Sequence, residues 1–228
     1  MKTTKFLFSL FGSVALAGCV SFFEDGVHPD SSDWEDVFDK SFSKAERQGG
    51  WIWDEKGYLT ATNSSTLFTK KDYGSYILDC QYVLAPKGNS GIFIYDTQHP
   101  THKIEVQLFD DYAEDISKYH TPYQLNCALY GRAAPTIVNS KPAGELNRLT
   151  LTCNGGLVKI ALNGKIVLDV NLDDWKDPLV NPDGSKVPKW HTKFPLLSTI
   201  PRHGRIGLQG LHGGAPVGFK YIKIREIK

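Results

Sequence analysis

The chain has 228 residues and carries 26 Lys and Arg against 25 Asp and Glu, a formal net charge of +1. Such a balance, without a long basic run, gives no reason to expect a nucleic-acid partner. Aromatic residues make up 12% of the chain, with 5 Trp and 10 Tyr. This content favours a ligand that stacks on rings, such as a carbohydrate, although the buried rings of a β-sandwich explain part of it.

Residues 1–19 have the pattern of an export signal. Lys2 and Lys5 precede a mostly apolar run, residues 6–16, which is too short to span a bilayer. The run ends in Leu-Ala-Gly-Cys, which resembles a bacterial lipoprotein box, in which the cysteine is lipidated and becomes the new N-terminus. We therefore predict an exported protein anchored through a lipid on Cys19 to the bacterial membrane, on its periplasmic or cell-surface side. The alternative is an ordinary signal with an accidental cysteine.

Residues 20–33 are polar and lack periodicity, which predicts a tether between membrane and domain. The remainder, 34–228, is long enough for one all-β domain with a sizeable core. Cys80, Cys127 and Cys153 form an odd set, so an exported protein has at most one internal disulfide among them. The Cys-x-x-Cys spacing of a sulfur-bound zinc site is absent from the sequence.

Short runs separated by turn residues recur along the whole domain and predict a two-layer antiparallel β-sandwich with little helix. Asn163-Gly164 is a strong signal for a type I′ hairpin turn. Residues 110–126 and 173–203 lack the strand pattern, and a loop as long as the second is usually a lid or a binding loop. The expected strands are 51–53, 58–62, 66–69, 76–83, 90–95, 103–109, 127–130, 146–154, 157–162, 165–170, 205–209 and 217–228.

Residues 88–111 contain two runs with period-two alternation, the pattern of half-buried strands. The side chains expected to face the core are Ile92, Ile94, Ile104, Val106 and Leu108. Those expected on the opposite face are Phe93, Tyr95, Glu105, Gln107 and Phe109. Polar and aromatic groups in the middle of strands suit a sugar-binding surface. A solvent-exposed sheet face without a ligand is the alternative.

Four segments, in this order and spacing, resemble the bacterial 3-keto-disaccharide hydrolase family, and the tail 219–225 resembles that family's ending. The resemblance covers about residues 34–228. It implies a concanavalin A-like jelly roll, in which two antiparallel sheets present a concave sugar-binding face. The four segments are Asn89-Ser90-Gly91-Ile92-Phe93, Glu105-Val106-Gln107 with Asp110, Ala128-Leu129-Tyr130-Gly131, and Gly204-Arg205-Ile206-Gly207-Leu208-Gln209 with His212-Gly213.

The chain departs from the family pattern at three places. Tyr95 stands where an Arg is common, Leu146 where a Trp is common, and Asn126-Cys127 where Thr-Gly is frequent. The first departure lies on the face expected to bind sugar, so it bears on the details of the substrate.

The residue types on this face favour one kind of chemistry. Retaining glycosidases need two carboxylates about 5–5.5 Å apart, whereas the expected face offers one, Glu105. A 3-keto sugar needs less, because its carbonyl acidifies the hydrogen on C2 and a single base can remove it. The enolate then expels the C1 substituent by β-elimination, and water can add back.

The candidate residues divide by role. The acid–base pair is Glu105 and His212. The groups that would hydrogen-bond the substrate or its enolate are Gln107, Gln209 and Tyr130. The rings that would stack on a sugar are Tyr95 and Trp190.

Each candidate has a structural alternative. His212 is then a turn residue that caps a strand, Glu105 pairs with an arginine such as Arg132, and Gln107 and Gln209 form a buried pair. No cofactor is evident in the sequence. A divalent metal held by Glu105, His212 and a further oxygen ligand stays open, since it would also polarise the ketone.

The sequence therefore predicts an enzyme that cleaves the glycosidic bond of a 3-keto-glycoside or 3-keto-disaccharide. The alternative is a non-catalytic carbohydrate-binding jelly-roll module on the cell envelope. A charged acid–base pair in the groove distinguishes the two, because a binding module does not need one. A third class, an adhesion or scaffold protein, predicts no concave pocket. No protein partner is predicted.

Overall fold

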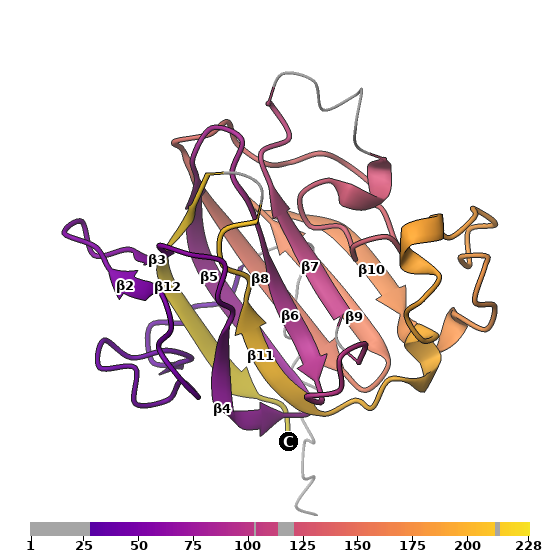
Figure 1. The fold of residues 1–228 in the computed structure, drawn as a ribbon, viewed down its shortest axis with the longest axis horizontal. Helices are drawn as coiled ribbons and strands as arrows, with labels where there is room; N and C mark the ends of the chain where they lie inside the picture. The colour runs from indigo at the N-terminus through magenta and orange to yellow at the C-terminus, as the bar shows by residue number, and fades with distance from the viewer. Residues whose placement is uncertain (1–27, 103, 114–120, 213–214) are drawn as a thin grey trace, which may run out of the picture.

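The computed structural model describes residues 28–102, 104–113, 121–212 and 215–228 (Figure 1). The signal segment and Cys19 lie outside the described residues, so lipidation stays a prediction. In the part of the chain that is described, no helix combines the length and apolar character needed to cross a membrane.

Two antiparallel sheets pack face to face, and the smaller sheet lies in front of the larger one in Figure 1. The smaller sheet has the order β4-β11-β6-β7, and the larger has the order β10-β9-β8-β5-β12-β3-β2, with β1 paired to β12. The helices of the described residues are four short 3-10 turns, η1 to η4. These features confirm the predicted jelly-roll sandwich.

The strands of the smaller sheet are β4 (Leu67–Tyr73), β6 (Asn89–Asp96), β7 (Ile104–Phe109) and β11 (Gly204–Leu208). Those of the larger sheet are β1 (Glu35–Asp36), β2 (Trp51–Trp53), β3 (Leu59–Ala61), β5 (Tyr76–Leu84), β8 (Leu146–Asn154), β9 (Leu157–Leu162), β10 (Lys165–Asn171) and β12 (Val217–Glu226). The 3-10 turns are η1 (Pro122–Gln124), η2 (Leu172–Asp174), η3 (Lys189–His191) and η4 (Leu197–Thr199).

The core lies between the two sheets. The expected inward set from β6 and β7 is buried, and it meets side chains of the larger sheet such as Leu78, Leu149 and Leu151. Each fully buried aliphatic side chain contributes about 1.5–3 kcal/mol. Because these positions face the core, the alternate positions of β6 and β7 face outward, away from the larger sheet.

The turn between β9 and β10 confirms the hairpin prediction. Asn163 and Gly164 both have positive φ, 48° and 84°, as a type I′ turn requires. The turn fixes the register in which β9 and β10 pair.

A β-bulge in β6 changes the direction of Tyr95. Phe93 pairs with Gly207 and Asp96 pairs with Arg205, so β6 has one residue more than β11 between these two pairs. Tyr95 absorbs the irregularity with a positive φ of 54°. A bulge shifts the inward–outward alternation by one position.

Tyr95 is therefore not on the outer face, and its predicted role in stacking on a sugar is wrong. Its side chain is fully buried in the core, and its hydroxyl donates a hydrogen bond to the carbonyl oxygen of Gly155 at 3.1 Å. The departure from the family pattern at this position consequently lies in the core and does not touch a sugar-binding surface.

Residues 28–33, expected in the tether, lie against the outer face of the larger sheet. They are held there by Asp79, whose carboxylate is fully buried and pairs with Arg148 at 2.9 Å. Other donors complete this network, and they are the hydroxyls of Ser31, Thr150 and Tyr221. The folded part of the chain thus includes residues from His28 onward.

The three cysteines of the domain are free thiols. Cys80, Cys127 and Cys153 are all fully buried. Burial raises the pKa of each thiol, to about 12 for Cys153. The three thiols are therefore protonated at neutral pH and have little nucleophilic character.

Candidate functional site

A row of side chains crosses the outer face of the smaller sheet. Phe68, Gly207, Phe93 and Glu105 are paired in register from β4 through β11 and β6 to β7. The rings of Phe68 and Phe93 stack across Gly207 with centroids 6.2 Å apart. A Cβ at Gly207 would lie 2.5 Å from the ring of Phe68, so the glycine makes this contact between rings possible. The row places an aromatic surface beside Glu105.

Glu105 lies over the backbone of the neighbouring strand. A Cβ on Gly91 would overlap one carboxylate oxygen of Glu105 and lie 2.8 Å from its Cγ. Gly91 thus supplies the space that the Glu105 side chain occupies. The carboxylate is partly buried on the outer face, as the period-two pattern predicted.

The segment 127–130 runs along the open edge of β7 and carries Tyr130 to Glu105. Its backbone forms hydrogen bonds with β7. Cys127 N–H donates to Gln107 O at 2.8 Å, and Tyr130 N–H donates to Glu105 O at 2.9 Å. The predicted strand here is reduced to isolated bridges of Leu129 with Val106 and Ala133. The segment covers part of an otherwise open sheet edge and fixes the Tyr130 ring beside the carboxylate.

A small polar cavity of about 170 Å³ brings the main sequence candidates together. Glu105 comes from β7 and His212 from the loop after β11, where the imidazole is exposed. The predicted acid–base pair therefore lines one cavity, although its two members are distant in sequence. The lining residues are Asn89, Glu105, Gln107, Tyr130, Gln209 and His212.

The amides in this cavity have unused hydrogen-bonding capacity. Gln107 donates to Asn89 Oδ1 at 3.4 Å, but the Oε1 atoms of Gln107 and Gln209 are buried without a hydrogen-bond partner. The two glutamines therefore do not bond each other, which rules out the alternative of a self-satisfied pair. An unpaired buried acceptor costs about 1–3 kcal/mol, and sugar hydroxyls are suitable donors for it.

Tyr130 is oriented to donate a hydrogen bond. Its phenol oxygen accepts from Gln124 Nε2 at 3.2 Å, which leaves its own O–H free to point elsewhere. Burial raises the pKa of the Tyr130 phenol, so the group keeps its proton at neutral pH. Tyr130 can therefore donate to an oxygen that becomes negative during a reaction.

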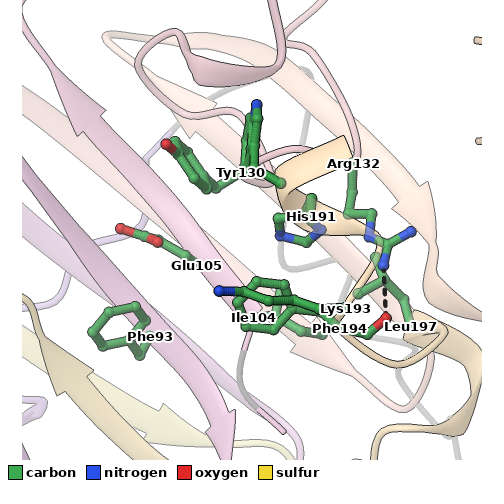
Figure 2. Close-up of a pocket in the computed structure, with 10 residues that line it drawn as sticks. Phe93, Ile104, Glu105, Tyr130, Arg132, His191, Lys193, Phe194 and Leu197 are labelled. Carbon is green, nitrogen blue, oxygen red and sulfur yellow. Dashed lines mark hydrogen bonds between the residues drawn. The ribbon is translucent and has the colours of Figure 1, made fainter. Parts of the chain in front are cut away.

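A larger cavity of about 380 Å³ adjoins the first, because Glu105 and Tyr130 line both (Figure 2). Half of its wall comes from 173–203, the long segment predicted to be a lid or binding loop. Trp190, the remaining stacking candidate, is 43% exposed and lies 5.0 Å from the Tyr130 ring, between centroids. The lining residues are Phe93, Ile104, Glu105, Tyr130, Arg132, Trp190, His191, Lys193, Phe194 and Leu197.

Polar and aromatic side chains that were not among the sequence candidates also line this cavity, namely Arg132, His191, Lys193 and Phe194. His191 stacks on Phe194 with centroids 4.6 Å apart, and Figure 2 shows its ring between Glu105 and Arg132. Burial, and then the charges of Arg132 and Lys193, lower the pKa of His191 to about 3. The imidazole is therefore neutral at neutral pH. The only sequence signal was the aromatic and basic content of the long loop.

Arg132 does not pair with Glu105, contrary to the structural alternative considered for that carboxylate. Its Nη2 donates to the carbonyl oxygens of Phe194 at 3.3 Å and Pro195 at 3.2 Å. Arg132 therefore holds the segment that forms the cavity wall.

A metal ion would find few ligands here. Among the described residues, no group of three or more His, Cys, Asp and Glu side chains is placed to hold one. A divalent ion at Glu105 and His212 would need amide oxygens, such as those of Gln107 and Gln209, as further ligands.

Comparison with known proteins identifies the family. The chain matches the model of the 3-keto-alpha-glucoside-1,2-lyase-like domain over residues 19–225. The chain belongs to this family. A search of curated proteins found no significant match.

Solved structures of candidate glycosyl hydrolases from Parabacteroides distasonis ATCC 8503 resemble this 3-keto-alpha-glucoside-1,2-lyase-like chain. One is 31% identical, with a TM-score of 0.78 over 85% of this chain and 99% of its own. Another is 21% identical, with a TM-score of 0.69 over 90% of this chain and 100% of its own, and shows the fold alone. Family and first relative together support a carbohydrate-active function.

Gly131 determines how closely the long loop approaches the site. Its φ is 71°, and a Cβ there would lie 2.7 Å from Cδ2 of His191 and 3.1 Å from the Trp190 ring. A side chain at this position would therefore push η3 away from the cavity.

We predict that Gly131→Ala lowers both stability and the affinity for a sugar ligand. Gly144→Ala is the matched control, because Gly144 has φ 89° but a Cβ added there would meet no atom within 4 Å. The control carries only the backbone cost of about 1–2 kcal/mol, whereas Gly131→Ala adds about 1–3 kcal/mol of overpacking. Urea denaturation measures the difference, and equal losses in the two variants would contradict the packing argument.

Proposed function

We propose that the protein cleaves the glycosidic bond of a 3-keto-glycoside or 3-keto-disaccharide by removing the proton on C2 and eliminating the C1 substituent, with or without later addition of water. The observation that supports this most is the composition of the polar cavity. This cavity contains one carboxylate and one imidazole, together with amide and phenol groups that can donate hydrogen bonds to an enolate oxygen.

The number of carboxylates favours elimination over double displacement. Among the described residues that line the two cavities, Glu105 carries the only carboxylate. Retaining glycosidases use two, one as nucleophile and one as acid. A ketone at C3 removes the need for the second, because it makes the C2 proton acidic enough for a single base.

The proposed reaction begins at Glu105. The carboxylate takes the C2 proton, and the electron pair moves into a C2–C3 double bond with negative charge on the C3 oxygen. The Tyr130 hydroxyl and the side-chain N–H groups of Gln107 and Gln209 are the donors available to that oxygen. The charge then returns to re-form the ketone, a C1–C2 double bond forms and the C1–O bond breaks.

His212 completes the sequence as the acid for the leaving oxygen. The imidazole is exposed in the loop after β11, so solvent can reach it between turnovers. Addition of water across the C1–C2 double bond then gives the free 3-keto sugar, and its omission gives an unsaturated product. The leaving alcohol is the second product in both cases.

The competing function is carbohydrate binding without catalysis. The exposed Trp190 beside Tyr130 would suit a binding module, since aromatic rings stack on sugars. A binding module gives no role to Glu105 and His212 as a pair, and the two functions separate on the variants that follow.

Glu105→Gln and His212→Ala should each lower kcat on a 3-keto-glycoside by at least about a hundredfold, because a positioned acid or base contributes about 10²–10⁴-fold. The melting temperature should stay within a few degrees of wild type. The assay compares a panel of 3-keto-glycosides with their unoxidised parents. Activity of both variants within about threefold of wild type would remove these residues from catalysis. Sugar binding without turnover by wild type would favour the binding module.

Gly91→Ala tests the placement of Glu105 without removing it. The added methyl group occupies the space of the carboxylate, so the Glu105 side chain must turn away and kcat should fall at least about tenfold. In the Glu105→Gln background the same substitution should have less effect on kcat, because the two changes act on one group. Equal effects in both backgrounds, measured as a double-mutant cycle, would show that Gly91 acts independently of Glu105.

We further propose that the protein is exported and anchored by a lipid on Cys19, as the Leu-Ala-Gly-Cys ending predicts. Cys19→Ser should abolish incorporation of radiolabelled fatty acid and leave soluble or unprocessed protein. Label retained by the variant would disprove lipidation at Cys19.

A further inference from the structure

Arg132 is a buried cation with unused donors. Its side chain lines the larger cavity and is 1% exposed. Nη2 donates to two backbone carbonyls, but Nε and Nη1 are buried without a hydrogen-bond partner. An unpaired buried polar group is costly, and a charged one more so. Such an arrangement indicates that a ligand supplies the missing hydrogen-bond acceptors.

The second buried arginine shows what a paired one looks like in this fold. Arg205 is 8% exposed, and its three nitrogens donate to the carboxylates of Asp96 and Glu46. Within the described residues, Arg132 has no carboxylate partner. Burial without compensation lowers the pKa of Arg132 from its usual value, but an arginine remains charged at neutral pH. Arg132 thus offers an uncompensated positive charge to the cavity.

The rest of the cavity wall narrows the chemistry of the ligand. Lys193 is a second cation, exposed at the cavity, and Figure 2 shows its amino group on the side of the cavity that faces Glu105. His191 is neutral and adds no charge. The remaining wall is rich in rings, among them those of Tyr130, Trp190 and Phe194. Cations beside aromatic side chains favour a flat ring that carries an anionic substituent.

The residues that line the two cavities indicate which part of the substrate each cavity would bind. The smaller one holds the amides and the acid–base pair, so the 3-keto sugar belongs there. The larger one shares Glu105 and Tyr130 with it and would receive the ring of the leaving group, so that the leaving oxygen lies at the junction of the two. We propose that Arg132, assisted by Lys193, binds a carboxylate on the leaving group, so that the protein prefers 3-keto-glycosides of acidic rings. This inference rests on the proposed function.

The test compares two substrates, the 3-keto-glucosides of 4-hydroxybenzoate and of 4-hydroxybenzamide. The measured quantity is the ratio of their kcat/KM values, in wild type and in Arg132→Met. Comparing ratios cancels the difference in leaving-group acidity between the two phenols. We expect Arg132→Met to lower the ratio of acid to amide at least about tenfold, because a guanidinium–carboxylate pair is lost. An unchanged ratio would overturn the inference.

Two further variants distinguish a direct contact between Arg132 and the ligand from an indirect effect of loosening the loop. Arg202 tethers the same segment through the carbonyls of Leu197 and Ile200 but does not line the cavity, so Arg202→Met should leave the ratio unchanged. Lys193→Gln, at an exposed position, should lower the ratio in the same direction as Arg132→Met but by less. A fall of the ratio as large in Arg202→Met as in Arg132→Met would attribute the effect to the loop and overturn the inference.

A binding measurement makes the inference independent of turnover. Calorimetry with 4-hydroxybenzoate and 4-hydroxybenzamide should show tighter binding of the acid by wild type, and Arg132→Met should remove that preference. If wild type shows this preference but cleaves no 3-keto-glycoside, the subsite stands and the proposed function fails. If wild type cleaves both substrates and no variant changes the ratio, the proposed function stands and the subsite fails.

Discussion

One steric constraint underlies the site, namely that the side chain of Glu105 occupies the space left by the missing side chain of Gly91. Neighbouring strands of a sheet lie about 4.8 Å apart, so a long side chain can lean over its partner strand only where that strand carries none. The same relation recurs at Gly207, which admits the stacked rings of Phe68 and Phe93, and at Gly131, which admits η3. The outer face is thus shaped by where side chains are absent. A glycine in a strand ordinarily weakens the strand. Here each glycine leaves room for neighbouring side chains, and these side chains form walls of the cavities.

Much of this architecture could be predicted from the sequence, because it follows from period-two alternation. Glu105 and Gln107 face outward since Val106 and Leu108 face the core. The alternation failed at Tyr95, where the chain adopts a positive φ that a tyrosine rarely takes. No residue type at that position signalled the bulge. Arg132 and His191 were missed for another reason, since the long loop that brings them together has no periodicity from which a position in space could be read.

Cys127 stands where the family often has glycine, and its backbone conformation is costly for any other residue. Its φ is 66°, a conformation that glycine adopts freely, and glycine is frequent here in the family that the sequence resembles. A side chain in this region costs about 1–2 kcal/mol. Cys127 is fully buried in the core cluster, so its packing offsets part of that cost. The conformation is kept because the segment must leave Cys127 N–H and Tyr130 N–H directed at β7.

The charges around Glu105 also bear on which reaction the site favours. A second carboxylate beside it would disfavour ionisation of both, whereas the cavity beyond it carries the cations Arg132 and Lys193 and a neutral His191. In elimination, negative charge passes from Glu105 through the sugar to the leaving oxygen. Positive groups on the leaving-group side favour this direction of charge movement, and their effect is strong because the cavity is partly shielded from water. The arrangement therefore supports the proposed elimination, which moves charge in one direction across the junction of the two cavities, over a double displacement, which needs a second carboxylate.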